Sequence, residues 1–400
     1  MRPEDLHCLG ETSIEDFLTL YWQKKPLLIR NAFADLQSPL TANELAGLAC
    51  EEHVNARLVF AEGIDEAGSK GKHWQVEFGP FDESRFSELP QSNWSILVSD
   101  VEKHLPETKA FLKNFHFIPD WRVDDLMISY APPGGSVGPH TDAYDVFLIQ
   151  LNGQRLWQIN ENYNEETLED SDLCILKNFT AEREWVLNAG DMLYLPPNVA
   201  HHGIAQSCKN TSGSNQQCLT ASVGFRAPSL KTITNDYIHF LNENSHDTTR
   251  YSDKSPVKPA HHAEISDATV SHFIDYLKQG FTLEPELVKQ WLGQFCSDNK
   301  TFEDFNHDKD DINFEQLVAI TTQSALMHSP YSRFLFSYSD QAALLFVDGN
   351  SYPVSKAFAE ELCEDEHLDF QQLEKIMTVD DKNILLALFN NGAVVTLENS

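Results

Sequence analysis

The sequence predicts an α+β protein: a β-rich core of the sandwich or barrel type, then helices, then a small winged-helix-like module. Short runs rich in β-branched and aromatic residues, separated by Gly, Asn and Pro, fill residues 124–227, a texture typical of a sandwich or barrel. Amphipathic helical patterns follow after residue 228, and residues 301–400 combine helical segments with a hairpin signal. We therefore expect a first domain over residues 1–227, with its β core at about 92–227, a helical region over 228–300 and a third domain over 301–400.

Length and composition are those of a multidomain globular protein. The chain has 400 residues, of which 41% are hydrophobic and 11% aromatic, enough for about two to four domains. Seven scattered cysteines without a CxxC pair are typical of reduced thiols, not of a disulfide framework or a zinc site. No apolar run could span a membrane, and the acidic start MRPEDLHCLGETS does not resemble a signal peptide. We expect a cytoplasmic protein.

The chain is strongly acidic, with 61 acidic and 29 basic residues and a net charge of −32. Such a surface repels phosphate backbones and attracts cationic partners. Two interpretations stay open: a surface adapted to solubility or salt, and a basic macromolecular partner. Residues 310–400 hold 15 acidic side chains against four basic ones, so direct DNA binding by the winged-helix-like module is not expected.

The predicted β core is preceded by helices. SIEDFLTLYWQKK begins with a serine cap and a helical pattern, and PLLIR predicts a strand after it. Residues 42–51 and 101–114 also predict helices. The strands predicted next are LMISYA, DVFLIQL, RLWQI, CILKNF, EWVLNA, MLYLPP and ASVGFRA, and Asn152-Gly153 between the second and third of them is a hairpin signal.

After residue 228 the pattern is mainly helical. LKTITNDYIHFLNE, ATVSHFIDYLKQGF and PELVKQWLGQFC predict amphipathic helices, with an irregular linker at 246–263. Their apolar faces suit a homodimer, although the same stripes could pack within one chain. NFEQLVAITTQSALM, SKAFAEELCE and DFQQLEKIM predict further helices, ALLFVDGNSYPV predicts a hairpin on Asp348-Gly349, and AVVTLE predicts a closing strand.

A His-x-Asp triplet, His140 and Asp142, precedes one of the strongest strands. Side chains two residues apart in an extended segment point the same way, so both could bind one ion. The triplet alone is weak, because two other His-x-acid pairs occur, at 262/264 and 367/369. The first of these lies in the linker, and no histidine follows the second.

A third ligand is expected from GDMLYLPPNVAHHG, as either His201 or His202. A double-stranded β-helix brings the two ends of its core strands together, so either histidine could meet His140. Two imidazoles and one carboxylate on one face, with open positions, are typical of non-haem Fe(II) oxygenases.

Arg155 lies on the strand RLWQI, flanked by Leu156 and Trp157. A charge in such a strand needs a partner or an anionic ligand, and a guanidinium can bind a carboxylate with two parallel hydrogen bonds. The far carboxylate of 2-oxoglutarate suits that role. A structural salt bridge or simple exposure is the alternative.

Four motifs, WQKKPLLIRNAF, DDLMISYAPPGGSVGPHTDAYDVFLIQLNGQRLWQI, GDMLYLPPNVAHHGIA and SVGFRAPS, resemble the JmjC-type bacterial ribosomal oxygenases of the cupin superfamily. The resemblance covers the whole chain in layout and implies a β-helix catalytic domain, a helical dimerisation region and a winged-helix-like C-terminus. It implies that His140, Asp142 and His201 bind Fe(II), that Arg155 binds the far carboxylate of 2-oxoglutarate, and that Ser129 offers a hydroxyl to the same end. SCKNTSGSNQQ (207–217) departs from the family pattern and is expected to extend a loop.

The resemblance further implies a hydroxylation that depends on Fe(II), 2-oxoglutarate and O2. Its target would be an arginine side chain, at C3, in the large-subunit ribosomal protein named L-sixteen. Carboxylates at the pocket mouth should then hold the guanidinium. Histidine hydroxylation and N-methyl-lysine demethylation would use the same metal site. A metal-free β-helix scaffold is disfavoured because all the expected ligands are present, and a cupin isomerase usually presents three histidines and a glutamate where Asp142 stands here.

Overall fold

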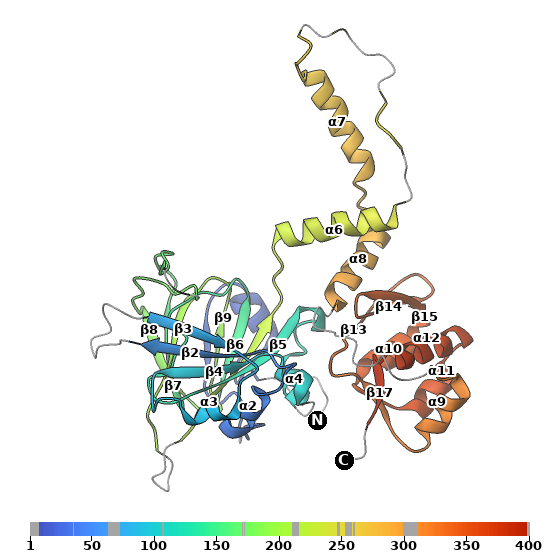
Figure 1. Cartoon of the computed structure of the whole chain (residues 1–400). Helices are drawn as coiled ribbons and strands as arrows, with labels where there is room; N and C mark the ends of the chain where they lie inside the picture. Colours follow the sequence, from blue (N-terminus) through green and yellow to red (C-terminus); the bar gives the residue numbers. More distant parts are fainter. Residues whose placement is uncertain are drawn as a thin grey trace. The chain divides into compact units, whose positions relative to one another are not determined.

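The computed structural model describes residues 8–34, 36–62, 73–105, 108–169, 171, 173–209, 216–245, 249–252, 258, 261–298 and 311–397. The chain forms two compact units, Met1–Ala227 and Pro228–Ser400, which are blue to green and yellow to red in Figure 1. No described helix is long and apolar enough to cross a membrane. The predicted loop at 207–217 and linker at 246–263 lie partly outside the described residues.

Short capped helices open the first unit. Helix α1 (Ile14–Asp16) is capped by the Ser13 hydroxyl and continues as a π-helical turn, η2 (Phe17–Tyr21), before strand β1 (Leu27–Ile29). The predicted helix over 42–51 is confirmed as α2 (Ala42–Leu48), which has a capping box. The helix predicted over 101–114 is instead divided into α4 (Val101–His104) and α5 (Lys109–Leu112); α3 (Glu83–Ser87) precedes them.

Two antiparallel sheets build the rest of this unit. In the described residues the larger sheet has the order β1-β9-β6-β11-β5-β4-β2-β3 and the smaller sheet has the order β10-β7-β8. The predicted double-stranded β-helix is confirmed. The strands of the larger sheet after β1 are β2 (Ala56–Glu62), β3 (His73–Phe78), β4 (Trp94–Val98), β5 (Val123–Ala131), β6 (Asp145–Asn152), β9 (Met192–Leu195) and β11 (Cys218–Phe225), and those of the smaller sheet are β7 (Gln154–Asn160), β8 (Arg183–Asn188) and β10 (Ala200–Ala205).

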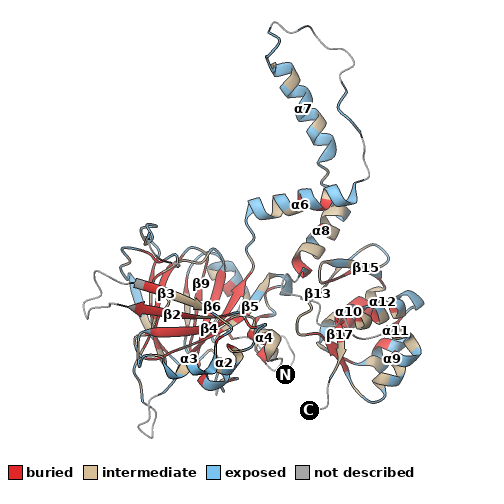
Figure 2. Ribbon diagram, viewed as in Figure 1, coloured by how far each residue is buried: buried red, intermediate tan, exposed pale blue. Residues whose placement is uncertain are grey.

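The larger sheet is covered on both faces, and its strands hold many of the buried residues (Figure 2). On one face the Phe147 ring lies 4.9 Å from the rings of both Phe115 and Tyr194. Alternate residues of β6, Val146 and Leu148, join the core against the smaller sheet. Burial of both faces explains why β6 contains the unbroken apolar run VFLI.

Two local expectations in this unit are wrong. Asn152-Gly153 closes no hairpin, because β6 pairs with β9 and β11 on its two edges and has no edge left for β7. Gly153 instead adopts a left-handed conformation (φ +68°) where the chain crosses to the smaller sheet. CILKNF forms no strand, and only the isolated bridge between Thr167 and Leu176 lies there. The sequence also did not reveal β2, β3 and β4.

The second unit begins with the three predicted amphipathic helices, α6 (Leu230–Asn244), α7 (Asp267–Gly280) and α8 (Pro285–Ser297). The hairpin on Asp348-Gly349 is confirmed, with both residues in the left-handed region. The helix predicted from Asn313 ends at Thr321, because residues 326–328 form a strand. The remaining elements are α9 (Phe314–Thr321), α10 (Lys356–Glu364), α11 (Phe370–Ile376) and α12 (Val379–Asn390), the sheet β13 (Phe334–Tyr338), β14 (Ala343–Val347) and β15 (Asn350–Val354), and the sheet β16 (His367–Leu368), β12 (Leu326–His328) and β17 (Val394–Thr396).

Candidate active site

Main-chain hydrogen bonds tie the loop that carries His140 to strand β10. The His140 N–H donates to the carbonyl of His201 at 3.0 Å, and the His201 N–H donates back to the carbonyl of His140 at 2.9 Å. The Asn198 N–H donates to the carbonyl of Asp142 at 2.7 Å. Residues 61 positions apart in the sequence are therefore neighbours in the β-helix, as the resemblance implied.

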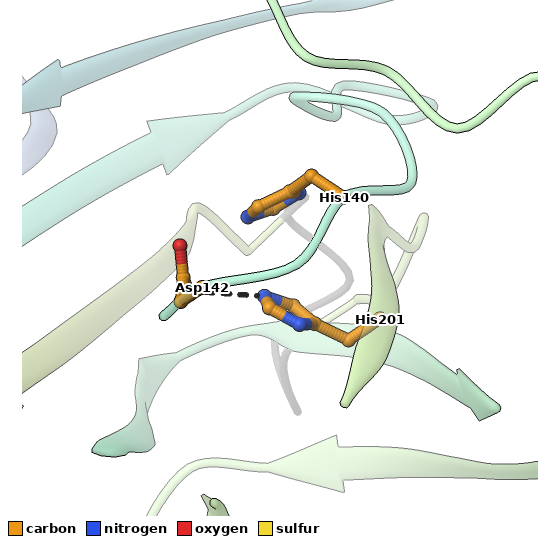
Figure 3. Close-up of side chains that lie close together, drawn as sticks. All are labelled: His140, Asp142 and His201. Atoms are coloured by element: carbon orange, nitrogen blue, oxygen red, sulfur yellow. Dashed lines mark ion pairs between the residues drawn. The ribbon is translucent and has the colours of Figure 1, made fainter. Parts of the chain in front are cut away.

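The predicted metal ligands converge. Ligand atoms of His140, Asp142 and His201 all lie within 4.8 Å of one another, and their side chains point to a common space (Figure 3). Nε2 of His201 is 3.5 Å from Oδ2 of Asp142, and the two imidazole centroids are 4.2 Å apart. Within the described residues no other group of three or more His, Cys, Asp or Glu side chains has this spacing.

Each imidazole is held in one orientation by a carbonyl. Nδ1 of His140 is 2.9 Å from the carbonyl oxygen of Gly138, and Nδ1 of His201 is 3.0 Å from that of Val199. A carbonyl can only accept, so each Nδ1 carries the proton and each Nε2 keeps a lone pair for a metal. Burial, followed by the nearby His140, lowers the pKa of His201 to about 4, which keeps His201 neutral at pH 7.

His202 lies on the opposite face of β10. Successive residues of a strand alternate, and the His202 ring lies 6.0 Å from Phe179, whereas the His201 ring lies 5.8 Å from Trp157. Gly203 lets this strand approach the indole, because a Cβ there would come within 2.7 Å of the Trp157 ring. The geometry therefore favours His201 over His202 as the third ligand.

Gly138 shapes the turn before His140. Its φ is +79°, and a Cβ at this position would lie 2.5 Å from Cδ1 of Ile175. A side chain would therefore be both strained and crowded. The Gly138 N–H donates to the Ser136 hydroxyl at 3.0 Å, which closes the turn that presents His140.

The three predicted ligands line a cavity of about 510 Å³ between the two sheets, and Arg155 and Ser129 line it as well. Arg155 is 4% exposed, and its guanidinium lies 5.8 Å from the Trp157 ring. Its Nε and Nη2 have no hydrogen-bond partner among the described residues. Buried guanidinium donors without a partner indicate an anionic ligand.

Ser129 lies on β5 opposite Thr220 of β11. Its hydroxyl donates to the Thr220 carbonyl over 3.3 Å, and the Thr220 hydroxyl donates to Oε1 of Gln150 at 3.1 Å. Ser129 is 6% exposed and Thr220 is 1% exposed. We call the part of the cavity lined by Arg155, Ser129 and Thr220 the Arg155 end, and this end is buried.

Acidic residues line the other end of the cavity, the Asp125 end. Asp124, Asp125 and Asp100 contribute to its wall, together with Tyr144, which is 40% exposed. Burial, followed by the charges of Glu102 and Asp100, raises the pKa of Asp125 to about 7. Sequence reasoning expected carboxylates here without naming them. Asp125, Met127 and Ser129 alternate along β5 and all line the cavity, so strand periodicity from Ser129 was the available signal.

Family models match both units. A model described as the JmjC domain matches residues 110–233, and one described as the ROXA-like winged helix matches residues 273–394. The chain is 35% identical over 286 residues to the ribosomal protein uL16 3-hydroxylase of Escherichia coli, covering 71% of each chain. It is 39% identical over 230 residues to the probable ribosomal oxygenase of Haemophilus influenzae, covering 56% of this chain and 53% of that protein.

Solved structures match over nearly the full length. The X-ray structure of Escherichia coli ycfD has a TM-score of 0.82 at 29% identity, covering 97% of this chain and 99% of that one. A structure of the same protein in complex with cobalt and 2-oxoglutarate has a TM-score of 0.79 at the same identity and coverage. The chain therefore belongs to the JmjC-type ribosomal oxygenases and is a 2-oxoglutarate-dependent dioxygenase.

Proposed function

We propose that this protein hydroxylates an arginine side chain, at C3, of a large-subunit ribosomal protein, using Fe(II), 2-oxoglutarate and O2. The observation that carries the proposal is the polarity of the cavity, which has an unpaired buried guanidinium at one end and carboxylates at the other. The similar Escherichia coli protein is named for hydroxylation of uL16, and this supports a ribosomal protein as the substrate.

His140, Asp142 and His201 would hold the Fe(II). The two lone pairs at Nε2 and the carboxylate suit a divalent ion of this class and leave positions for other ligands. When bound, Fe(II) with 2-oxoglutarate and O2 supplies the oxidation, yielding succinate, carbon dioxide and a hydroxylated carbon. The carbonyls of Gly138 and Val199 fix the orientation of both imidazoles and leave each Nε2 available to the metal.

Arg155 and Ser129 would bind the co-substrate. A guanidinium presents parallel N–H groups to a carboxylate, and the Ser129 hydroxyl can turn from the Thr220 carbonyl, 3.3 Å away, toward the same oxygen atoms. Both residues lie in the buried part of the cavity, where water competes little for these hydrogen bonds. Their role is to orient the co-substrate.

The Asp125 end would receive the substrate side chain. Asp125 is half-buried beside the exposed Asp124. Tyr144, which also lines this end, forms a hydrogen bond with the predicted metal ligand Asp142, so this end adjoins the metal ligands. A guanidinium placed against Asp125 would bring its aliphatic carbons toward the metal ligands. Arginine fits this arrangement better than histidine, because it carries a permanent cation at the end of a long apolar stem.

Helix α7 supports the predicted homodimer. None of its described residues is buried, and its apolar side chains fall at the i, i+3, i+4, i+7 spacing of one helical face. A contiguous exposed apolar face is typical of an interaction surface. Sedimentation analysis of Leu277→Asp, which places a charge on this face, should show a shift from dimer to monomer. The face consists of Val270 (46% exposed), Phe273 (43%), Ile274 (48%), Leu277 (67%) and Phe281 (41%).

The decisive experiment incubates the protein with a ribosomal protein mixture, Fe(II) and 2-oxoglutarate. Intact-mass analysis should find one basic protein heavier by one oxygen atom, and fragmentation should place that atom on an arginine. Hydroxyl on a histidine, or loss of a methyl group from lysine, would replace the proposal with one of the two related activities. Asp142→Ala is the control that should give no product.

A further inference from the structure

We propose that Ser95 is a further positioning residue of the cavity, and that its hydroxyl donates a hydrogen bond to the far carboxylate of 2-oxoglutarate. This inference rests on the proposed function of the Arg155 end. Ser95 lies on β4, which pairs with β5 on one edge and with β2 on the other.

Ser95 has an unsatisfied hydroxyl that faces the cavity. Its side chain is 0% exposed, and Oγ has no hydrogen-bond partner among the described residues. Ser95 and Leu97 line the cavity, whereas Trp94, Ile96 and Val98 belong to the core on the other face of β4. Buried hydroxyl groups nearly always have a partner, so this one indicates a ligand or a water molecule in the cavity.

Strand register places Ser95 at the Arg155 end. Leu97 pairs with Ser129 on β5, so Ser95, two residues earlier, lies beside Ala131. Ala131 packs against Ala205, and Ala205 pairs with Arg155 across the smaller sheet. Asp125 is six residues from Ala131 along β5, roughly 20 Å in a strand, so Ser95 is remote from the substrate end.

The available donors match a carboxylate in number. A carboxylate has about four lone-pair positions. Arg155 supplies two unpaired donors, Nε and Nη2, and Ser129 supplies a hydroxyl that now makes only a 3.3 Å hydrogen bond. Ser95 supplies the fourth donor. A neutral ligand would leave the buried charge of Arg155 uncompensated and a cationic ligand would repel it, so the Ser95 hydroxyl is assigned to an anionic group.

The test compares two ligands that differ only at the far end, 2-oxoglutarate and 2-oxopentanoate. Calorimetric titration of the full-length protein loaded with Mn(II) should show that Ser95→Ala weakens 2-oxoglutarate binding about 10-fold to 100-fold, the range for a hydrogen bond to a charged group. Binding of 2-oxopentanoate, which lacks the far carboxylate, should stay unchanged. Thr108→Val, which removes a buried hydroxyl that donates to the Leu105 carbonyl, is the matched control and should bind both ligands as the wild type does.

Equal weakening of both ligands by Ser95→Ala, or no weakening of either, would overturn the inference. Ser95→Cys keeps nearly the same volume with a poor donor and should give the same selective loss, which protects the test against a folding defect in the alanine variant. Failure of the wild-type protein to prefer 2-oxoglutarate over 2-oxopentanoate would instead contradict the proposed role of Arg155. The two proposals therefore fail in different ways.

Discussion

The two ends of the cavity differ in charge and in exposure. The Arg155 end is buried, with Arg155, Ser129 and Thr220 at most 6% exposed, and it presents unpaired donors. The Asp125 end includes exposed residues such as Asp124 and Tyr144 and is acidic. A small dianion can be enclosed, whereas a side chain of a large protein must enter from solvent. The difference shows how one cavity can keep two ligands apart on either side of the predicted metal ligands.

Removing one of the predicted metal ligands, on which both ligand-binding ends depend, should have the largest effect. His201→Ala deletes one predicted ligand, and we expect metal loading and turnover to fall by more than about 100-fold, beyond the loss seen when only an outer-shell partner is removed. The matched control is His202→Ala, on the neighbouring residue that faces the other side of β10. Metal content measured after dialysis should distinguish the two variants, and equal loss in both would contradict the assignment of His201.

Breaking the Arg155 end should affect the co-substrate alone. Arg155→Ala removes a buried charge-assisted contact worth about 2–5 kcal/mol, so the KM for 2-oxoglutarate should rise by roughly 30-fold to several thousand-fold. The KM for the protein substrate should stay nearly constant, because Arg155 lies at the buried end. Steady-state kinetics with each ligand varied in turn provides the measurement. A change confined to the protein substrate would reverse the proposed orientation of the two ligands.

Breaking the Asp125 end should produce the complementary result. Asp125→Asn removes the charge that would hold a guanidinium, and the KM for an arginine-containing peptide should rise about 10-fold to 100-fold. The pKa of Asp125 is raised to about 7, so wild-type affinity should fall as the pH drops below 7 and the carboxyl becomes neutral. The variant should lose this pH dependence of KM. Asp120→Asn, at an exposed carboxylate, is the control that should retain it.

Glu102 acts on the Asp125 end through its charge. Its replacement should have the smallest effect, which we expect on the stability of the protein. Its carboxylate accepts from the Leu126 N–H at 3.0 Å, and burial raises its pKa from 4.5 to about 7. The folded protein therefore holds a proton between these pH values that the unfolded chain releases, and its stability falls as pH rises through that window. Glu102→Gln should stabilise the protein by about 1–3 kcal/mol at pH 8 and much less at pH 5.

Denaturant unfolding of Glu102→Gln at the two pH values would measure this effect. The control is Glu77→Gln, because Arg85 lowers the pKa of Glu77 and that variant should lose stability. Equal stability changes of Glu102→Gln at pH 5 and pH 8 would show that the buried carboxyl is not the cause.

Local sequence patterns predicted the parts of the site that lie within one segment. His140, Asp142 and Arg155 lie within one segment of 16 residues, and the structure places all three at one cavity. The choice between His201 and His202 could not be made locally, because it depends on the register between β10 and β7. The hairpin predicted at Asn152-Gly153 was wrong because a turn that joins two sheets uses the same residue types as a hairpin turn.

Contributions from outside the β-helix motif were the hardest to predict. Strands β2, β3 and β4 extend the larger sheet beyond β5, and NWSILVSD contains nothing that distinguishes Ser95 from a serine in any buried strand. Only the pairing of β4 with β5 brings it to the cavity. The periodicity of β5 could have predicted Asp125, but its raised pKa depends on burial and then on the charge of Glu102, which comes from a helix earlier in the chain.

The paired main-chain hydrogen bonds between His140 and His201 bear on how the protein responds to iron supply. They join the two histidine segments through main-chain groups and not through the metal ligand atoms, unlike small domains whose folding depends on the metal itself. A chelator should therefore strip the site without unfolding the β-helix, and added iron should restore it without refolding. A cell short of iron would keep this protein as a folded, inactive reserve that resumes work when the metal returns.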